Sequence, residues 1–148
     1  SMAPQSTSPT RLTPVRKTGL SIPAICFGTS ALGDMPATYG YGVDEARANA
    51  TLAAIFGSGV GFLDTSRNYG LGRSEARIGA AIRARGGLPK GFVISSKLDR
   101  NMDTNVFDGD RARRSLEESL KALGAAIRAA LQADGPTLIE MTPRMAGL

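Results

Sequence analysis

The 148-residue sequence contains no histidine, no tryptophan and only one cysteine, Cys26. Without histidine, the chain lacks the side chain that most often serves as a general base and as a metal ligand, so we predict no metal site. A single cysteine cannot form an intramolecular disulfide and is typical of a reducing cytoplasm. Because Cys26 lies within an apolar stretch, we expect it to be a small buried side chain.

Long apolar runs are also absent, since none approaches the roughly 20 residues that a membrane-spanning helix needs. We therefore expect no membrane partner. The first residues, SMAPQSTSPTRLTP, have neither the apolar core of a signal peptide nor a helical pattern. Their polar composition predicts a disordered leader over residues 1–15, and the Ser-Met start is typical of the remnant of an expression tag.

Clustered charge is missing as well. Lys and Arg number 18, Asp and Glu number 13, and the formal net charge is +5, but the basic residues are spread along the chain. No aromatic residues alternate with them, so the distribution argues against nucleic-acid binding. Arg113 and Arg114 precede Glu117 and Glu118 by four residues, a spacing that predicts ion pairs along one face of a helix.

From residue 17 onward, strand-like and helix-like patterns alternate. Short apolar runs predict strands at residues 24–27, 60–64, 91–97 and 137–141. Helical periodicity predicts helices at residues 43–59, 74–87 and 108–124, with Asp44 and Ser74 as N-caps and with Leu116, Leu120 and Leu123 on the buried face of the last helix. This alternation indicates one α/β domain of βαβ units, in which helices cover a parallel sheet.

Polar side chains follow the predicted strands: Thr29 and Ser30 after the first, Asp64 after the second and Lys97 after the third. Because the carboxyl ends of parallel strands meet at one rim, we expect these side chains to converge there. Tyr69 follows Asp64 in a glycine-rich loop. A lysine beside a phenol lowers the pKa of that phenol, and a carboxylate can orient the lysine. Such a trio could exchange a proton with a carbonyl or an alcohol while a cofactor moves a hydride.

The ordinary interpretation of the same residues also stays open. A strand-end aspartate often caps the following turn, a tyrosine in a glycine-rich loop is often a packing residue, and a strand-end lysine can be an ordinary surface residue. Spacing alone does not separate the two interpretations.

Three stretches, GFLDTSRNYGLGRSEARIGAAI, FVISSKLDR and ARRSLEESLKALG, resemble the N-terminal part of the aldo-keto reductases. The resemblance runs from about residue 16 to residue 124. That family consists of NADP- or NAD-dependent oxidoreductases built as (β/α)₈ barrels. Within it, TYGYG and LDTSRNYG are most similar to the branch that oxidises free aldoses such as L-fucose or D-threo-aldoses, or pyridoxal.

The resemblance implies a role for each residue of the predicted rim. Tyr69 is then the proton donor and acceptor, Lys97 lowers the pKa of Tyr69, and Asp64 pairs with Lys97. Thr29 and Ser30 border the pocket for the nicotinamide and the substrate. The implied cofactor is NADP or NAD, and the implied substrate is a small aldose or aldehyde.

The sequence also departs from the family pattern. Where the family has a histidine at the end of the fourth strand, this chain has Met141, followed by Pro143. A complete (β/α)₈ barrel takes about 250 residues, and no G-x-G-x-x-G or P-loop motif offers another phosphate site. Helical pattern also resumes after Gly124, where the family proceeds to a strand. We therefore expect a half-barrel over residues 16–124 that does not catalyse a reaction by itself, and we leave open whether it binds the cofactor.

The tail, residues 125–148, has a weaker second resemblance. ALQADGPTLIEMTP is similar to the C-terminal helix and strand of thiamine-diphosphate decarboxylases, so the tail could have a different origin. The sequence thus predicts a truncated or chimeric aldo-keto reductase. The alternative is a non-enzymatic, recombined half-barrel that self-associates, because open sheet edges and an apolar inner face favour association. A flavodoxin-like binding module is a further alternative, although it lacks a phosphate loop.

Overall fold

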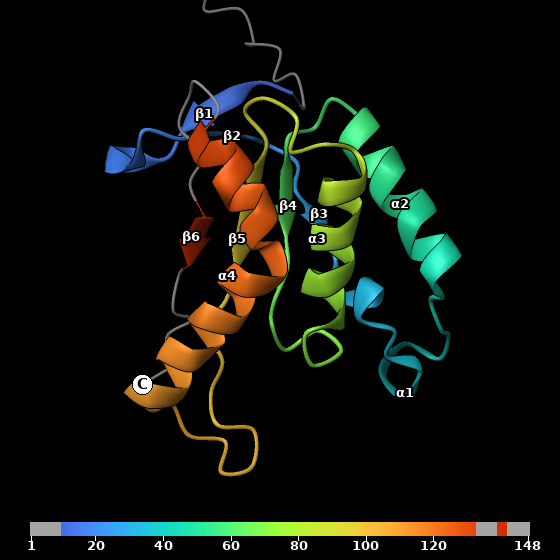
Figure 1. Ribbon diagram of the computed structural model, residues 1–148, viewed down its shortest axis with the longest axis vertical. Helices are drawn as coiled ribbons and strands as arrows, with labels where there is room; N and C mark the ends of the chain where they lie inside the picture. Colours follow the sequence, from blue (N-terminus) through green and yellow to red (C-terminus); the bar gives the residue numbers. More distant parts are fainter. Residues whose placement is uncertain (1–9, 133–138, 142–148) are drawn as a thin grey trace, which may run out of the picture.

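The computed structural model describes residues 10–132 and 139–141, in which helices pack on a parallel sheet and a small hairpin lies beside it (Figure 1). The strands are β1 (Leu12–Pro14), β2 (Ser21–Pro23), β3 (Phe27–Gly28), β4 (Phe62–Asp64), β5 (Val93–Ser96) and β6 (Ile139–Met141). The α-helices are α1 (Pro36–Tyr39), α2 (Glu45–Gly57), α3 (Arg73–Ala84) and α4 (Gly109–Gln132). Two 3-10 helices, η1 (Arg16–Thr18) and η2 (Ser30–Gly33), complete the described elements.

The main sheet is parallel and has the strand order β3-β4-β5-β6. One row of residues runs across it, because Phe27 pairs with Leu63, Leu63 with Ile94, and Ile94 with Ile139. The predicted α/β class with parallel βαβ units is confirmed. The predicted strand near the C-terminus is confirmed as the fourth strand of this sheet; Pro143 lies outside the described residues.

The N-terminal hairpin was not predicted from the sequence. Strand β1 pairs antiparallel with β2, with Thr13 opposite Ile22, and the backbone N–H of Val15 donates to the carbonyl of Leu20 at 2.8 Å. Disorder was predicted for residues 1–15, and this prediction is wrong for β1. Main-chain hydrogen bonds to a partner strand stabilise this short exposed segment, and a partner is not visible in local composition. Residues 1–9 of the predicted leader lie outside the described residues.

Strand β3 is shorter than predicted and lies at one edge of the described sheet. The predicted strand began at Ala24, but the observed strand begins at Phe27, and Ile25 and Cys26 are exposed. The prediction that Cys26 is buried is therefore wrong. Within the described chain, residues 24–26 pair with no neighbouring strand, so their apolar character alone does not bury them.

One face of the sheet forms the hydrophobic core with the helices. Leu63 of β4 and Ile94 of β5 belong to this core. The helix residues buried with them are Leu52, Ile55, Ile78, Ile82 and Leu123. At the start of α2, the Asp44 side chain accepts a hydrogen bond from the backbone N–H of Arg47 at 2.8 Å, which confirms the predicted N-cap. In the described part of the chain, no helix has the length and apolarity that a membrane crossing requires.

The opposite face of the sheet is mixed, whereas an apolar inner face was predicted. Because successive residues of a strand point to opposite faces, Phe62 and Asp64 lie on the other side from Leu63. They are in register with Val93 and Ser95 of β5. Val93 is buried, and the other three are half-buried. The carboxyl end of this face is therefore polar.

Helix α3 begins differently from the prediction. Its N-cap is Gly72, which has a φ of 102° in the left-handed region, and Ser74 lies inside the first turn, fully buried. The Ser74 hydroxyl donates to the carbonyl of Thr29 at 3.1 Å and lies 3.0 Å from the hydroxyl of Thr65. Ser74 thus joins α3 to the ends of two strands, whereas the predicted cap was a local interaction.

Helices α3 and α4 lie side by side (Figure 1) and approach closely. A Cβ atom added to Gly79 of α3 would lie 2.0 Å from the carbonyl oxygen of Ala122 of α4. This proximity explains why the predicted leucine face of α4 is partly wrong: Leu123 is buried, Leu116 is half-buried and Leu120 is exposed. Small side chains are needed where two helix backbones meet.

The buried positions of α4 include two serines, Ser115 and Ser119, on the side that faces α3 and β5. The helix continues without a break through Gly124 to Gln132. Gly124 therefore does not end the helix. The predicted boundary between residues 124 and 125 lies inside one continuous helix.

We predict that Gly79→Ala lowers the free energy of unfolding by about 1–3 kcal/mol, the usual cost of forcing extra atoms into a packed interior. The added methyl group would collide with the backbone of α4, which cannot move aside as a side chain can. Urea denaturation followed by circular dichroism measures the effect. Gly57→Ala is the matched control, because a Cβ atom there has nothing within 4 Å, and we expect a change of at most about 1 kcal/mol, in the stabilising direction. Unchanged stability of Gly79→Ala would contradict the close approach.

Candidate active site

The carboxyl ends of β4 and β5 bring Asp64 and Lys97 into direct contact. The Lys97 ammonium donates hydrogen bonds to Asp64 Oδ2 at 2.5 Å and to the carbonyl of Thr65 at 2.9 Å. The other carboxylate oxygen of Asp64 accepts a hydrogen bond from the Ser95 hydroxyl at 2.5 Å. Both oxygens of Asp64 are therefore held by β5 and the residue that follows it, and the direction of the Lys97 side chain is fixed.

Tyr69 completes the predicted trio. The Lys97 ammonium lies 5.2 Å from the centre of the Tyr69 ring, within the distance of a cation–π contact. The structure thus brings together Asp64, Tyr69 and Lys97, the three residues that the sequence suggested. Lys97 contacts Asp64 on one side and the ring of Tyr69 on the other.

Backbone packing positions the loop that carries Tyr69. A Cβ atom on Gly33 would lie 2.6 Å from the nitrogen of Gly70, and Gly70 has a φ of +64°. Arg73 donates to the carbonyls of Gly33 and Asp34 at 2.9 and 3.1 Å. Because only glycine fits this contact between η2 and the loop, Gly33 and Gly70 define where Tyr69 lies. This contact was not predicted from the sequence.

The two predicted cofactor-binding residues have different surroundings. Thr29 is buried, and its hydroxyl donates to the carbonyl of Asp64 at 2.8 Å. Ser30 is half-buried, and its hydroxyl accepts a hydrogen bond from the Tyr39 hydroxyl at 2.7 Å. Thr29 therefore positions the strand end that carries Asp64, and Ser30 lies nearer the surface. Their proposed contact with a cofactor stays a prediction.

Four charged residues beside the trio form a closed set, which we call the charge ring: Arg67, Asp99, Arg111 and Glu118. The hydrogen bond from Arg111 and, after it, that from Arg67 lower the pKa of Glu118 to about 2, although burial acts in the opposite direction. The hydrogen bond to Glu118 raises the pKa of Arg111 above its usual value.

The ion pairs that were predicted along α4 are wrong. Glu118 was expected to pair with Arg114, but the structure pairs it with Arg67 and Arg111, and it pairs Arg113 with Asp110. Arg67 comes from a distant loop. Sequence spacing reports only neighbours on the same helix, so it could not identify this partner.

The buried carboxyl group of Glu75 was also not identified as a functional group from the sequence. It is fully buried in the first turn of α3, and its Oε1 atom accepts a hydrogen bond from the Ser96 hydroxyl at 2.5 Å. Among the described residues, its Oε2 atom and the Ser119 hydroxyl have no hydrogen-bond partner. Burial raises the pKa of Glu75, and the hydrogen bond from Ser96 opposes this only in part.

Cys26 also belongs to this rim. Partial burial of its thiol, and next the nearby carboxylate of Asp64, raise its pKa to about 11, whereas the Lys97 ammonium acts in the opposite direction. The thiolate, which is the nucleophilic form, is therefore scarce at neutral pH.

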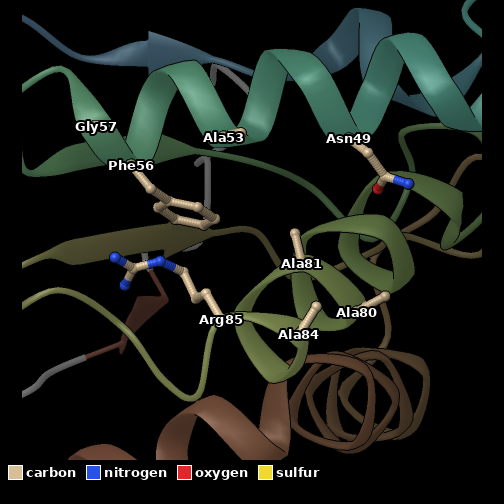
Figure 2. Close-up of a pocket in the computed structure, with 8 residues that line it drawn as sticks. All are labelled: Asn49, Ala53, Phe56, Gly57, Ala80, Ala81, Ala84 and Arg85. Atoms are coloured by element: carbon tan, nitrogen blue, oxygen red, sulfur yellow. The ribbon is translucent and has the colours of Figure 1, made fainter.

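A groove between α2 and α3 has a volume of about 630 Å³. Figure 2 shows Phe56 of α2 and Arg85 at the end of α3 beside this groove. Arg85 lies 5.3 Å from the centre of the Phe56 ring. The lining residues are Asn49, Ala53, Phe56, Gly57, Ala80, Ala81, Ala84 and Arg85. None of them belongs to the trio or the charge ring, so we place the candidate site at the strand ends.

The parallel strands, the helices on one face and the charged residues at the carboxyl ends define a segment of a (β/α)₈ barrel with its site at the usual rim. The sequence profile of the aldo/keto reductase family matches residues 24–131. The chain therefore belongs to the aldo-keto reductase family. No curated protein sequence matches it significantly. The family match also extends beyond residue 124, the predicted boundary.

Solved structures agree with this assignment. A Pseudomonas aeruginosa protein described as an aldo-keto reductase is 33% identical, with a TM-score of 0.57 over 76% of this chain and 41% of its own. An aldo-keto reductase from Klebsiella pneumoniae, solved with NADPH, is 28% identical, with a TM-score of 0.51 over 70% of this chain and 32% of its own. An aldo-keto reductase from Bacillus halodurans is 19% identical, with a TM-score of 0.60 over 77% of this chain and 36% of its own. At this identity, the similarity supports the fold alone. The chain spans about two fifths of the Pseudomonas relative.

We predict that Glu75→Gln makes stability less dependent on pH. The pKa of Glu75 is raised in the folded protein, so folding favours the protonated form. Its stabilising effect is complete below the ordinary glutamate pKa and declines as the pH rises through that value towards the raised one. Glutamine stays neutral throughout. Urea denaturation at pH 5 and pH 8 should therefore give a smaller difference for Glu75→Gln than for the wild type.

Glu117→Gln is the control for this experiment, because Glu117 is exposed on α4. We expect it to keep the pH dependence of the wild type. If the two variants behave alike, the buried carboxyl group is not the source of the dependence.

Proposed function

We propose that this chain carries the proton-transferring residues of an NADP- or NAD-dependent oxidoreductase. The substrate is a small aldose or aldehyde. Reduction of its carbonyl group gives the alcohol, and oxidation of an aldose gives the lactone. The observation that supports this proposal is the placement of Lys97, 2.5 Å from Asp64 and 5.2 Å from the centre of the Tyr69 ring. Family membership and the NADPH bound to the Klebsiella pneumoniae relative agree with it. Similarity of TYGYG to the aldose-oxidising branch suggests the substrate class.

In the proposed reaction, the Tyr69 hydroxyl gives a proton to the substrate oxygen during reduction and takes one back during oxidation. When bound, the nicotinamide supplies or accepts the hydride. Lys97 places a positive charge beside the Tyr69 ring, which stabilises the phenolate left after the proton is given up. Asp64 holds Lys97 in that place.

The described residues near the trio offer few free hydrogen-bonding groups to such a cofactor. The Thr29 hydroxyl is used inside the protein, and Ser30 already bonds Tyr39. Arg67 and Arg111, which lie near the trio, are paired with Glu118. The sequence also has no histidine to donate a hydrogen bond to the substrate oxygen. We therefore propose that the 148-residue chain by itself binds the dinucleotide weakly and has little or no activity.

The first test is calorimetric titration of the chain with NADPH and with NADH, followed by assays with L-fucose, related aldoses and pyridoxal. We expect no saturable binding below millimolar cofactor. Micromolar affinity would contradict weak binding by this chain and would show that a dinucleotide site exists. If turnover is then detected, Tyr69→Phe should lower it by about 10²–10⁴-fold, the usual contribution of a general acid or base.

Lys97→Met should lower such turnover as well, because it removes the charge beside Tyr69. Lys90→Met is the matched control, since Lys90 is exposed in the loop between α3 and β5, and it should retain the rate. An active chain whose rate is unaffected by Tyr69→Phe would contradict the assignment of Tyr69.

A second candidate function is structural, as a half-barrel that self-associates. Within the described chain, β3 pairs only with β4 and β6 only with β5, so each end of the sheet has an open edge. The core residues lie on the face that packs against the helices, and the opposite face carries Phe62 and Val93. The open edges, together with the half-buried Phe62 on the opposite face, favour pairing with another chain.

We predict that the 148-residue chain forms a homo-oligomer, because a second copy can cover these edges. Multi-angle light scattering after size-exclusion chromatography at tens of micromolar measures the mass. A dimer or larger assembly is expected. A mass near the 15.4 kDa of the single chain would count against self-association.

A further inference from the structure

The charge ring joins the two loops that carry Tyr69 and Lys97. Arg67 lies two residues before Tyr69, and Asp99 lies two residues after Lys97. The other two members, Arg111 and Glu118, lie on α4, seven residues apart and therefore on one side of the helix. Any displacement of either loop relative to α4 would have to stretch this set of ion pairs.

The contacts within the ring form a closed circuit. Arg67 Nε lies 2.5 Å from Glu118 Oε2 and 3.7 Å from Asp99 Oδ2. Arg111 donates to Asp99 Oδ2 at 3.2 Å and to the two oxygens of Glu118 at 3.1 and 3.0 Å. The double contact between Arg111 and Glu118 fixes the orientation of the carboxylate that receives Arg67.

Burial makes the ring difficult to break. The exposed side-chain fraction is 3% for Asp99, 17% for Arg111, 22% for Arg67 and 41% for Glu118. Two positive and two negative charges balance, so the ring has no net charge. Removing one partner would leave an uncompensated charge beside the nearly buried Asp99, which is costly in a partly desolvated site. The backbone N–H of Asp99 also donates to the Ser115 hydroxyl at 2.9 Å, which fixes the same loop to α4.

The trio needs such support because a ring-to-ammonium contact is weak. The Tyr69–Lys97 contact spans two separate loops, and the cation–π attraction across it is small at an exposed site. The Gly33–Gly70 contact positions the Tyr69 loop on the side of η2. On the side of α4, the ion pair between Arg67 and Glu118 holds the same loop.

We propose that Arg67 is a positioning residue, which holds Tyr69 against Lys97 through its ion pairs with Glu118 and Asp99. The consequence of this positioning for catalysis rests on the proposed function, whereas the placement of Tyr69 against Lys97 does not. Lysine at position 67 would keep the charge but not the planar guanidinium group that lies between the two carboxylates.

The proposal is tested by NMR spectroscopy of the 148-residue chain without substrate or cofactor. The ring current of Tyr69 shifts the Hε resonances of Lys97, and cross-relaxation joins the ring protons to those of Lys97. Tyr69→Leu defines the spectrum without the ring. In Arg67→Met we expect the cross-peaks to be lost and the Lys97 resonances to move most of the way to their positions in Tyr69→Leu. Glu118→Gln should move them in the same direction, and Arg67→Lys should restore them only in part.

Arg113→Met is the matched control, because Arg113 is also an arginine of α4 but is exposed and outside the ring. It should leave the Lys97 resonances unchanged. Methyl resonances of Leu63 and Ile78 in the core report whether each variant remains folded. Should Arg67→Met unfold the chain, the milder Glu118→Gln variant carries the test.

Unchanged Lys97 shifts and cross-peaks in a folded Arg67→Met or Glu118→Gln protein would overturn the proposal. The double variant Arg67→Met/Glu118→Gln should shift Lys97 no further than the larger of the two single variants, because both act through one contact; additive shifts would also count against it. Since the readout needs no turnover, an inactive chain would bear on the proposed function and leave this result unaffected.

Discussion

The ion pair between Asp64 and Lys97 is the interaction on which the candidate site depends. It joins the carboxyl ends of two neighbouring strands, and the Ser95 hydroxyl holds the second oxygen of the same carboxylate. Parallel pairing of β4 with β5 places Asp64 opposite Ser95, two residues before Lys97. The position of Lys97, and therefore the charge beside Tyr69, follows from the register of the sheet.

Polar groups also occupy the interface between the sheet and its helices. Glu75 bonds Ser96, the residue before Lys97, and Ser115 bonds the backbone of Asp99, two residues after it. The small side chains of α4 permit the close approach to Gly79 of α3. The same helix surface that packs closely thus also fixes the loop after β5. Packing and site geometry are coupled through α4.

The sequence allowed the main elements and the trio to be predicted, because these depend on local patterns. Asp44 as N-cap and Leu123 as a buried residue follow from helical spacing, and the convergence of Asp64 and Lys97 follows from the rule for parallel strands. Three features were not predicted from the sequence: the β1–β2 hairpin, the exposure of Cys26 and the role of Ser74 inside α3. The hairpin and Ser74 depend on hydrogen-bond partners outside their own segments, and Cys26 is exposed because its segment pairs with no strand.

The sequence by itself therefore determined the order of strands and helices, the family and the residue types available at the rim. Only the tertiary structure decided how those residues pair. Glu118 meets Arg67 across 51 positions of sequence rather than an arginine one turn away, and Glu75, in the first turn of α3, is buried beside Ser96. Periodicity reports which face of an element is buried, whereas ion pairs and hydrogen bonds between elements depend on the relative placement of those elements, which local sequence does not encode.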